Sequence, residues 1–141
     1  MNMTPRRLVL IADDNRDTRE MYTHYLGMIG YVVETAADGR EAVLKARLLR
    51  PAVIVLDLGM PGMDGWEAMR LIRADAKTAT TPIIVLNGHD LKDYLKHAAI
   101  AEGALSYLMK PCLPEQLARE IDAHINARNA AVGRSRVASA E

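Results

Sequence analysis

The stretch VIVLDLGMPGMDGWE, residues 53–67, decides the fold class of this 141-residue chain. Four apolar residues and an aspartate are followed by a turn rich in glycine and by the start of a helical pattern. A short run that is apolar on both faces is typical of a central parallel strand covered by helices on both sides. The stretch therefore predicts a strand ending at Asp57, a loop in which Gly62 and Gly65 provide turning freedom, and a helix.

Four other runs repeat the strand pattern, at residues 8–12, 31–35, 83–86 and 105–109. Helical patterns follow all five runs, which gives five strand-helix units. Because crossovers between parallel strands are right-handed, these units predict an α/β fold with a doubly wound, five-stranded parallel sheet flanked by five helices. The mixed composition of residues 31–35 places that strand at an edge of the sheet.

Composition limits the classes of protein to which the chain can belong. Half of its residues are apolar, and 18 basic side chains balance 18 acidic ones, so the surface lacks the positive charge typical of nucleic-acid binding. We expect no nucleic-acid partner. The longest apolar runs are too short for a signal sequence or a membrane span, and the single cysteine, Cys112, cannot form an internal disulfide. These features predict a cytoplasmic protein without membrane attachment.

One folded domain accounts for nearly all of the chain. We expect it to cover residues 1–126, which is enough chain for one compact core. Residues 127–141 are mostly small and polar, with few groups to bury, and predict a frayed helix end followed by a disordered tail.

Three acidic residues and a lysine follow predicted strands that are distant in sequence. Asp13 and Asp14 come after the first strand, Asp57 ends the third and Lys110 follows the fifth. Alone, the Asp13-Asp14 pair is better explained as a helix cap with solvated charge. The carboxyl ends of parallel strands share one edge, however, so all four side chains should meet there. Two carboxylates about 4 Å apart repel by roughly 4 kcal/mol at an effective dielectric of about 20, which favours a bound cation. Carboxylates suit Mg²⁺, and the cluster predicts a phosphoryl and metal site.

Four segments resemble the receiver domain of bacterial two-component response regulators: LVLIADDN (8–15), VIVLDLGMPGMDGWE (53–67), PIIVLNG (82–88) and GALSYLMKP (103–111). The resemblance extends from about Leu8 to about Ile125. Within the family, the chain resembles the single-domain chemotaxis regulators. It implies the flavodoxin-like strand order 2-1-3-4-5. It also implies a phosphoprotein that takes part in signal transduction, rather than an enzyme.

The resemblance assigns a role to each residue of the cluster. Asp57 would accept the phosphoryl group and, with Asp14 and the backbone carbonyl of Gly59, would bind Mg²⁺ directly. Asp13 would act on the ion through water. Lys110 would pair with the phosphoryl group, and its bond to the following proline is commonly cis in the family.

Asn87 is where the chain departs from the family. Receivers usually place serine or threonine there, whose hydroxyl bonds the phosphoryl group and moves on activation. Tyr107 matches the aromatic residue that turns inward with it, although an ordinary strand tyrosine is an equally good interpretation. Asn87 therefore supports a second hypothesis, in which the chain is a receiver-like binding module that acts without phosphorylation.

The resemblance also implies the partners. A histidine kinase or a phosphotransfer protein would supply the phosphoryl group, and a downstream protein would bind the face formed by the fourth helix, the fifth strand and the fifth helix. The sequence does not decide whether that face also forms a homodimer. Two enzyme classes on the same fold fit poorly, because the first strand carries neither the Asp-x-Asp motif of haloacid-type phosphatases nor the hydroxyl-rich phosphate loop of flavodoxins.

Overall fold

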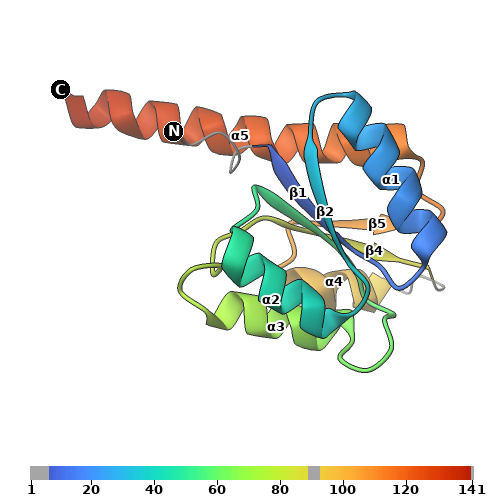
Figure 1. Cartoon of the computed structure of the whole chain (residues 1–141). Coiled ribbons are helices and arrows are strands. Elements are labelled where there is room, and N and C mark those ends of the chain that lie inside the picture. Colours follow the sequence, from blue (N-terminus) through green and yellow to red (C-terminus); the bar gives the residue numbers. More distant parts are fainter. Residues whose placement is uncertain (1–6, 89–92, 141) are drawn as a thin grey trace.

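The computed structural model describes the backbone of residues 7–88 and 93–140 and the side chains of residues 7–88 and 95–127. Five parallel strands form one sheet in the order β2-β1-β3-β4-β5 (Figure 1). This confirms the predicted fold class and places the strand of mixed composition at an edge. The strands are β1 (Leu8–Ala12), β2 (Val32–Ala36), β3 (Val53–Asp57), β4 (Ile83–Asn87) and β5 (Ser106–Met109).

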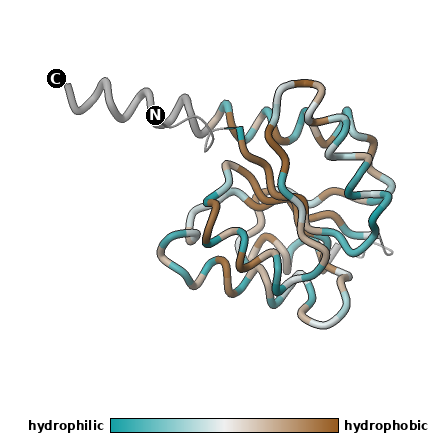
Figure 2. The backbone as a smooth tube through the Cα atoms, in the orientation of Figure 1, coloured by the Kyte–Doolittle hydropathy of each residue, from teal (hydrophilic) through white to brown (hydrophobic). Residues whose placement is uncertain are grey.

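Helices cover both faces of the sheet, α1 and α5 on one side and α2, α3 and α4 on the other (Figure 1). Their bounds are α1 (Arg16–Met28), α2 (Gly39–Leu49), α3 (Gly65–Ala74), α4 (Asp93–Ala101) and α5 (Pro114–Ala140). Alternate residues of each strand point to opposite faces, so the sheet contributes to two separate apolar cores. The central strands are accordingly strongly hydrophobic (Figure 2).

The three central strands are buried along their whole length, as their apolar runs predicted. In the sheet, Ala12 lies beside Leu56, and Asp57 lies beside Leu86. The last residues of β1, β3 and β4 therefore end at nearly the same level. Whatever follows these strands is brought to one edge of the sheet, and this register positions the candidate site.

At the outer edge of the sheet, β2 is partly covered by a lysine from α2. The Lys45 ammonium donates a hydrogen bond to the backbone carbonyl of Thr35 at 2.5 Å and pairs with the Glu34 carboxylate at 3.6 Å. One backbone acceptor of the edge strand is thereby satisfied within the domain.

Helix α5 is longer than the sequence led us to expect. It continues past residue 126 to Ala140, where we expected a frayed end and a disordered tail. Alanine and arginine are frequent in this part of the chain and favour the helical backbone even without an apolar face to bury. Residue 141 lies outside the described residues, and the domain boundary at 126 stays a prediction. None of the helices in the described residues combines the length and apolar character that crossing a membrane requires.

Candidate functional site

Three carboxylates meet where β1 and β3 end. One oxygen from each of Asp13, Asp14 and Asp57 lies within 4.8 Å of the other two. Asp13 is only 1% exposed and Asp57 only 5%, whereas Asp14 is open to solvent. The structure thus brings together the acidic residues that the sequence places after separate strands. Two of them are buried, which is unusual for aspartate unless a partner compensates the charge.

Backbone N–H groups hold one oxygen of each buried carboxylate. The N–H of Asn15 donates to Asp13 Oδ1 at 2.9 Å, and the N–H of Gly59 donates to Asp57 Oδ1 at 2.9 Å. Asn15 also caps α1, since its side chain accepts the N–H of Thr18 at 2.9 Å. Each acid is therefore fixed by the turn that directly follows its strand.

Lys110 contacts the other oxygen of both buried acids. Its Nζ lies 2.7 Å from Asp13 Oδ2 and 3.2 Å from Asp57 Oδ2. The backbone N–H of Lys110 donates to the carbonyl of Asn87 at 2.9 Å, so the last bond between β4 and β5 directs the residue toward the site. The Lys110–Pro111 peptide bond is cis, as the resemblance implied.

The electrostatics of the site are those of an acidic cluster that one cation only partly neutralises. Burial raises the pKa of Asp57, and the charge of Asp13 adds to the effect, against the N–H of Gly59 and the ammonium of Lys110. For Lys110, burial lowers the pKa, but the hydrogen bond and charge of Asp13 and the charge of Asp57 outweigh it, and the pKa is raised overall. Lys110 stays an ammonium, and one positive charge faces three carboxylates.

This donor set fits a hard divalent cation. Three carboxylates within 4.8 Å and one ammonium leave two negative charges at the mouth of the site. Mg²⁺ prefers oxygen ligands and is usually held by one or two carboxylates together with water and phosphate oxygens. The exposed carboxylate of Asp14 leaves the solvent side open for such ligands.

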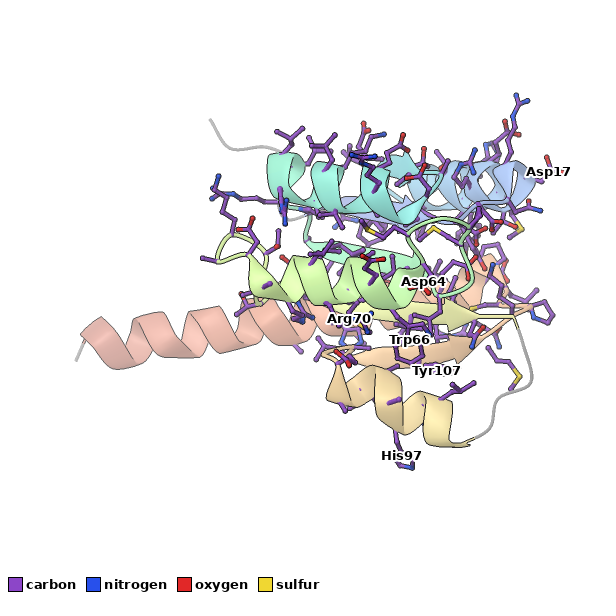
Figure 3. All side chains as sticks on the ribbon, turned by 90° about the horizontal axis from the view of Figure 1, so that it is seen from below. Asp17, Asp64, Trp66, Arg70, His97 and Tyr107 are labelled. Carbon is purple, nitrogen blue, oxygen red and sulfur yellow. The ribbon has the colours of Figure 1, made fainter. Side chains whose placement is uncertain are left out.

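Asn87 and Tyr107 are in direct contact. The buried amide of Asn87 donates from Nδ2 to the Tyr107 hydroxyl at 2.9 Å. The Tyr107 ring packs against the core on the α3 and α4 side of the sheet, as does Trp66 (Figure 3). The residue at the family's switch position is therefore bonded directly to the aromatic residue.

Gly65 allows α3 to begin directly against the end of β3. A Cβ at this position would lie 2.3 Å from the backbone oxygen of Asp57. The N–H of Gly65 donates to the carbonyl of Leu58 at 3.2 Å, which closes the loop between them. We expected turning freedom at both loop glycines. The φ of +71° at Gly62 agrees with this. At Gly65, in contrast, a glycine is required because the start of α3 lies close to the backbone at the end of β3.

Sequence reasoning missed Arg19. Its NH1 donates to the backbone carbonyl of Asp13 at 2.8 Å, from the second turn of α1. The spacing of six residues between a strand-end aspartate and an arginine on the following helix was the signal that could have identified it.

Removing the charge of Asp57 should stabilise the metal-free protein. Because burial and Asp13 raise its pKa, stability falls as the pH rises from the unfolded pKa to the folded pKa and stays lower above both. Asp57→Asn should raise the free energy of unfolding at neutral pH by about 1 to 2 kcal/mol, a part of the roughly 4 kcal/mol repulsion of two close carboxylates.

Urea unfolding of the parent and Asp57→Asn without metal, from about pH 3 to about pH 8, measures this difference. Asp17→Asn is the control, because it removes an exposed carboxylate from the first turn of α1. This control variant should not raise the free energy of unfolding. Equal stability of the parent and Asp57→Asn throughout this range would contradict the expected repulsion.

Comparison with known sequences identifies one protein family. Residues 9–122 match the pattern of the response regulator receiver domain. The transcriptional regulatory protein HprR of Escherichia coli is 33% identical over 122 residues, which cover 86% of this chain and 53% of HprR. The chain spans about half the length of the curated relatives it matches.

Solved structures agree with the sequence matches. The chemotaxis protein CheY4 of Vibrio cholerae is 38% identical with a TM-score of 0.78, covering 86% of this chain and 98% of CheY4. The receiver domain of the sensor histidine kinase PA1611 from Pseudomonas aeruginosa is 31% identical with a TM-score of 0.78, covering 85% of this chain and 98% of that domain. The structure of that domain contains a magnesium ion coordinated in its active site cleft.

Proposed function

Because the chain belongs to the response regulator receiver domains of two-component systems, we propose that it accepts a phosphoryl group on Asp57 and passes the signal on by binding another protein. The observation that carries this proposal is the buried Asp57 carboxylate, which lies beside two further acids and the Lys110 ammonium. A histidine kinase or a phosphotransfer protein would be the donor. Mg²⁺ would be the cofactor.

In the proposed reaction, an oxygen of Asp57 attacks the phosphorus of the donor. A new oxygen–phosphorus bond forms as the bond to the donor's leaving group breaks, and the leaving group takes a proton from solvent. Such transfers depend mainly on positioning and charge stabilisation. The N–H of Gly59 orients the Asp57 carboxylate, and Lys110 can pair with oxygens of the incoming group.

The acidic residues would hold the metal ion. We infer that Asp14, Asp57 and the carbonyl of Gly59 bind Mg²⁺ directly and that Asp13 acts through water. When bound, the ion neutralises charge on the phosphoryl oxygens. Lys110 already contacts Asp13 and Asp57, so it stays close to the place where that charge develops.

The proposed output surface lies on α4, β5 and α5. Within the described residues, Ile100 of α4 is 47% exposed, Met109 of β5 is 58% exposed, and Leu105, directly before β5, is 55% exposed. Apolar groups exposed on this face are consistent with a protein partner. The balanced charge of the chain supports the same choice over nucleic acid.

Incubation with Mg²⁺ and acetyl phosphate tests the proposal. Intact mass spectrometry should show the addition of one phosphoryl group, which should be lost again at alkaline pH because an acyl phosphate hydrolyses readily. A protein whose mass stays unchanged with this donor and with phosphoramidate would favour the second candidate function, a receiver-like module that binds its target without phosphorylation.

The hydrogen bond between Asn87 and Tyr107 is the observation that favours this second candidate. It holds the tyrosine against the core. A ligand shifts a two-state equilibrium only by its difference in affinity for the two states. If the aromatic residue is already held inward, phosphorylation changes the position of its side chain on β5 less.

Asn87→Thr should restore the response of Tyr107 to phosphorylation. A hydrogen bond contributes about 1 kcal/mol net. Its loss should therefore raise the population of the state in which Tyr107 is not held inward several-fold before activation. NMR of the Tyr107 ring with and without beryllofluoride should show a larger change in Asn87→Thr than in the parent. Tyr107→Phe with Asn87 intact is the control, because it removes the same bond from the other side. Equal and complete changes in the parent and Asn87→Thr would mean that the amide substitutes for a hydroxyl.

A further inference from the structure

Arg19 holds the backbone that carries two of the three clustered acids. Its guanidinium donates from NH1 to the carbonyl oxygen of Asp13 at 2.8 Å, in a partly buried position. That carbonyl belongs to the peptide group joining Asp13 to Asp14. Because a peptide group is planar, fixing its oxygen also fixes the direction in which the chain continues to Asp14.

Asp14 depends on this backbone more than the other two acids do. Asp13 and Asp57 are each held by a backbone N–H and by Lys110. Within the part of the chain that the structure describes, no hydrogen bond or salt bridge reaches the exposed carboxylate of Asp14. Its distance from the other two carboxylates is therefore governed by the torsion angles on either side of the Asp13–Asp14 peptide group.

We propose that Arg19 is a positioning residue for the divalent-cation site and acts through the Asp13–Asp14 peptide to align the Asp14 carboxylate with Asp57. This inference rests on the proposed function, because it takes Mg²⁺ as the ion. Arginine suits the role, since its planar guanidinium stays charged at every relevant pH and its bond to a carbonyl is charge-assisted. Groups that orient metal-binding carboxylates without touching the ion commonly set its affinity.

A Mg²⁺ titration of the full chain tests the proposal. Arg19→Ala should bind Mg²⁺ about tenfold more weakly, the lower end of the effect of removing such an orienting group. Calorimetry and the rise of the melting temperature with Mg²⁺ both report the affinity. Arg16→Ala is the matched control: this arginine is one turn earlier on α1, and its side chain is 81% exposed and pairs with Glu20 at 3.0 Å. Its affinity for Mg²⁺ should equal that of the parent.

Two comparisons separate positioning from a general structural role. An Arg19→Ala protein that melts earlier without metal but binds Mg²⁺ like the parent would overturn the proposal. In an Asp14→Asn background, Arg19→Ala should cause little further loss of affinity, because the group through which it acts is gone. The same loss in both backgrounds would also overturn it.

Two other outcomes are distinguishable in the same experiment. If Arg19→Ala does not fold, Arg19→Lys replaces it with the same expectations, since lysine keeps the charge but loses the planar donor. A parent protein that does not bind Mg²⁺ would overturn the proposed metal site together with this inference. A parent that binds Mg²⁺ with the same affinity as Arg19→Ala overturns this inference alone.

Discussion

Asp57→Asn should take up no phosphoryl group from acetyl phosphate under conditions in which the parent takes up one. The amide that replaces the carboxylate is not a nucleophile for phosphorus. Lys110→Ala should slow the reaction by about 10²- to 10³-fold, the typical effect of removing one stabilising group from a developing charge. Intact mass analysis over time measures both changes.

Lys77→Ala is the matched control for the lysine variant. Lys77 is exposed and lies in the segment between α3 and β4, so its replacement removes one positive charge from the chain outside the site. Its rate should equal that of the parent. A phosphoryl group found on a histidine, or one that persists in Asp57→Asn, would contradict the assignment of Asp57 as the acceptor.

Gly65→Ala should destabilise the fold by about 3 kcal/mol, the upper end of the range for overpacked sites. The added Cβ would lie 2.3 Å from the Asp57 oxygen and 2.6 Å from the Leu58 Cα, and both of these are backbone atoms that cannot move aside without shifting β3. Urea unfolding measures the loss. The same variant should also bind Mg²⁺ more weakly, because the displaced backbone carries Asp57.

Gly27→Ala is the control for this change. Gly27 is in the last turn of α1, and a Cβ there would have no neighbour within 4 Å. Alanine favours the helix over glycine by about 0.5 to 1 kcal/mol, so Gly27→Ala should stabilise the protein. If the two alanine variants have the same stability, close packing at Gly65 is not what requires a glycine.

The sequence predicted the sheet well because its signals there are redundant. Each central strand is an uninterrupted apolar run, and such runs fit only a sheet that is covered on both faces. The buried faces of the helices are harder to predict from the sequence than the strands are. On α1 the structure buries Tyr22 and Leu26, whereas the adjacent Met21 is 43% exposed, because consecutive helical residues point about 100° apart.

The members of the candidate site were predictable, but the bonds among them were not. Asp57 ends a strand, and Asp13, Asp14 and Lys110 come directly after strands, so the shared edge of a parallel sheet is enough to bring them together. The bond between Asn87 and Tyr107 depends on side-chain rotamers and on the exact register of β4 and β5. No pattern of residue types contains that information.

The contact of Lys45 on α2 with the edge strand β2 has a consequence for the behaviour of the protein at high concentration. The backbone groups of Val33 and Thr35 face the open side of β2, because those of the alternate residues pair with β1. An added strand would have to pair with these groups. Lys45 already occupies the Thr35 carbonyl and places a charge there that a second strand would have to desolvate. The β2 edge of the sheet is thus less open to intermolecular strand addition and to the aggregation that follows from it.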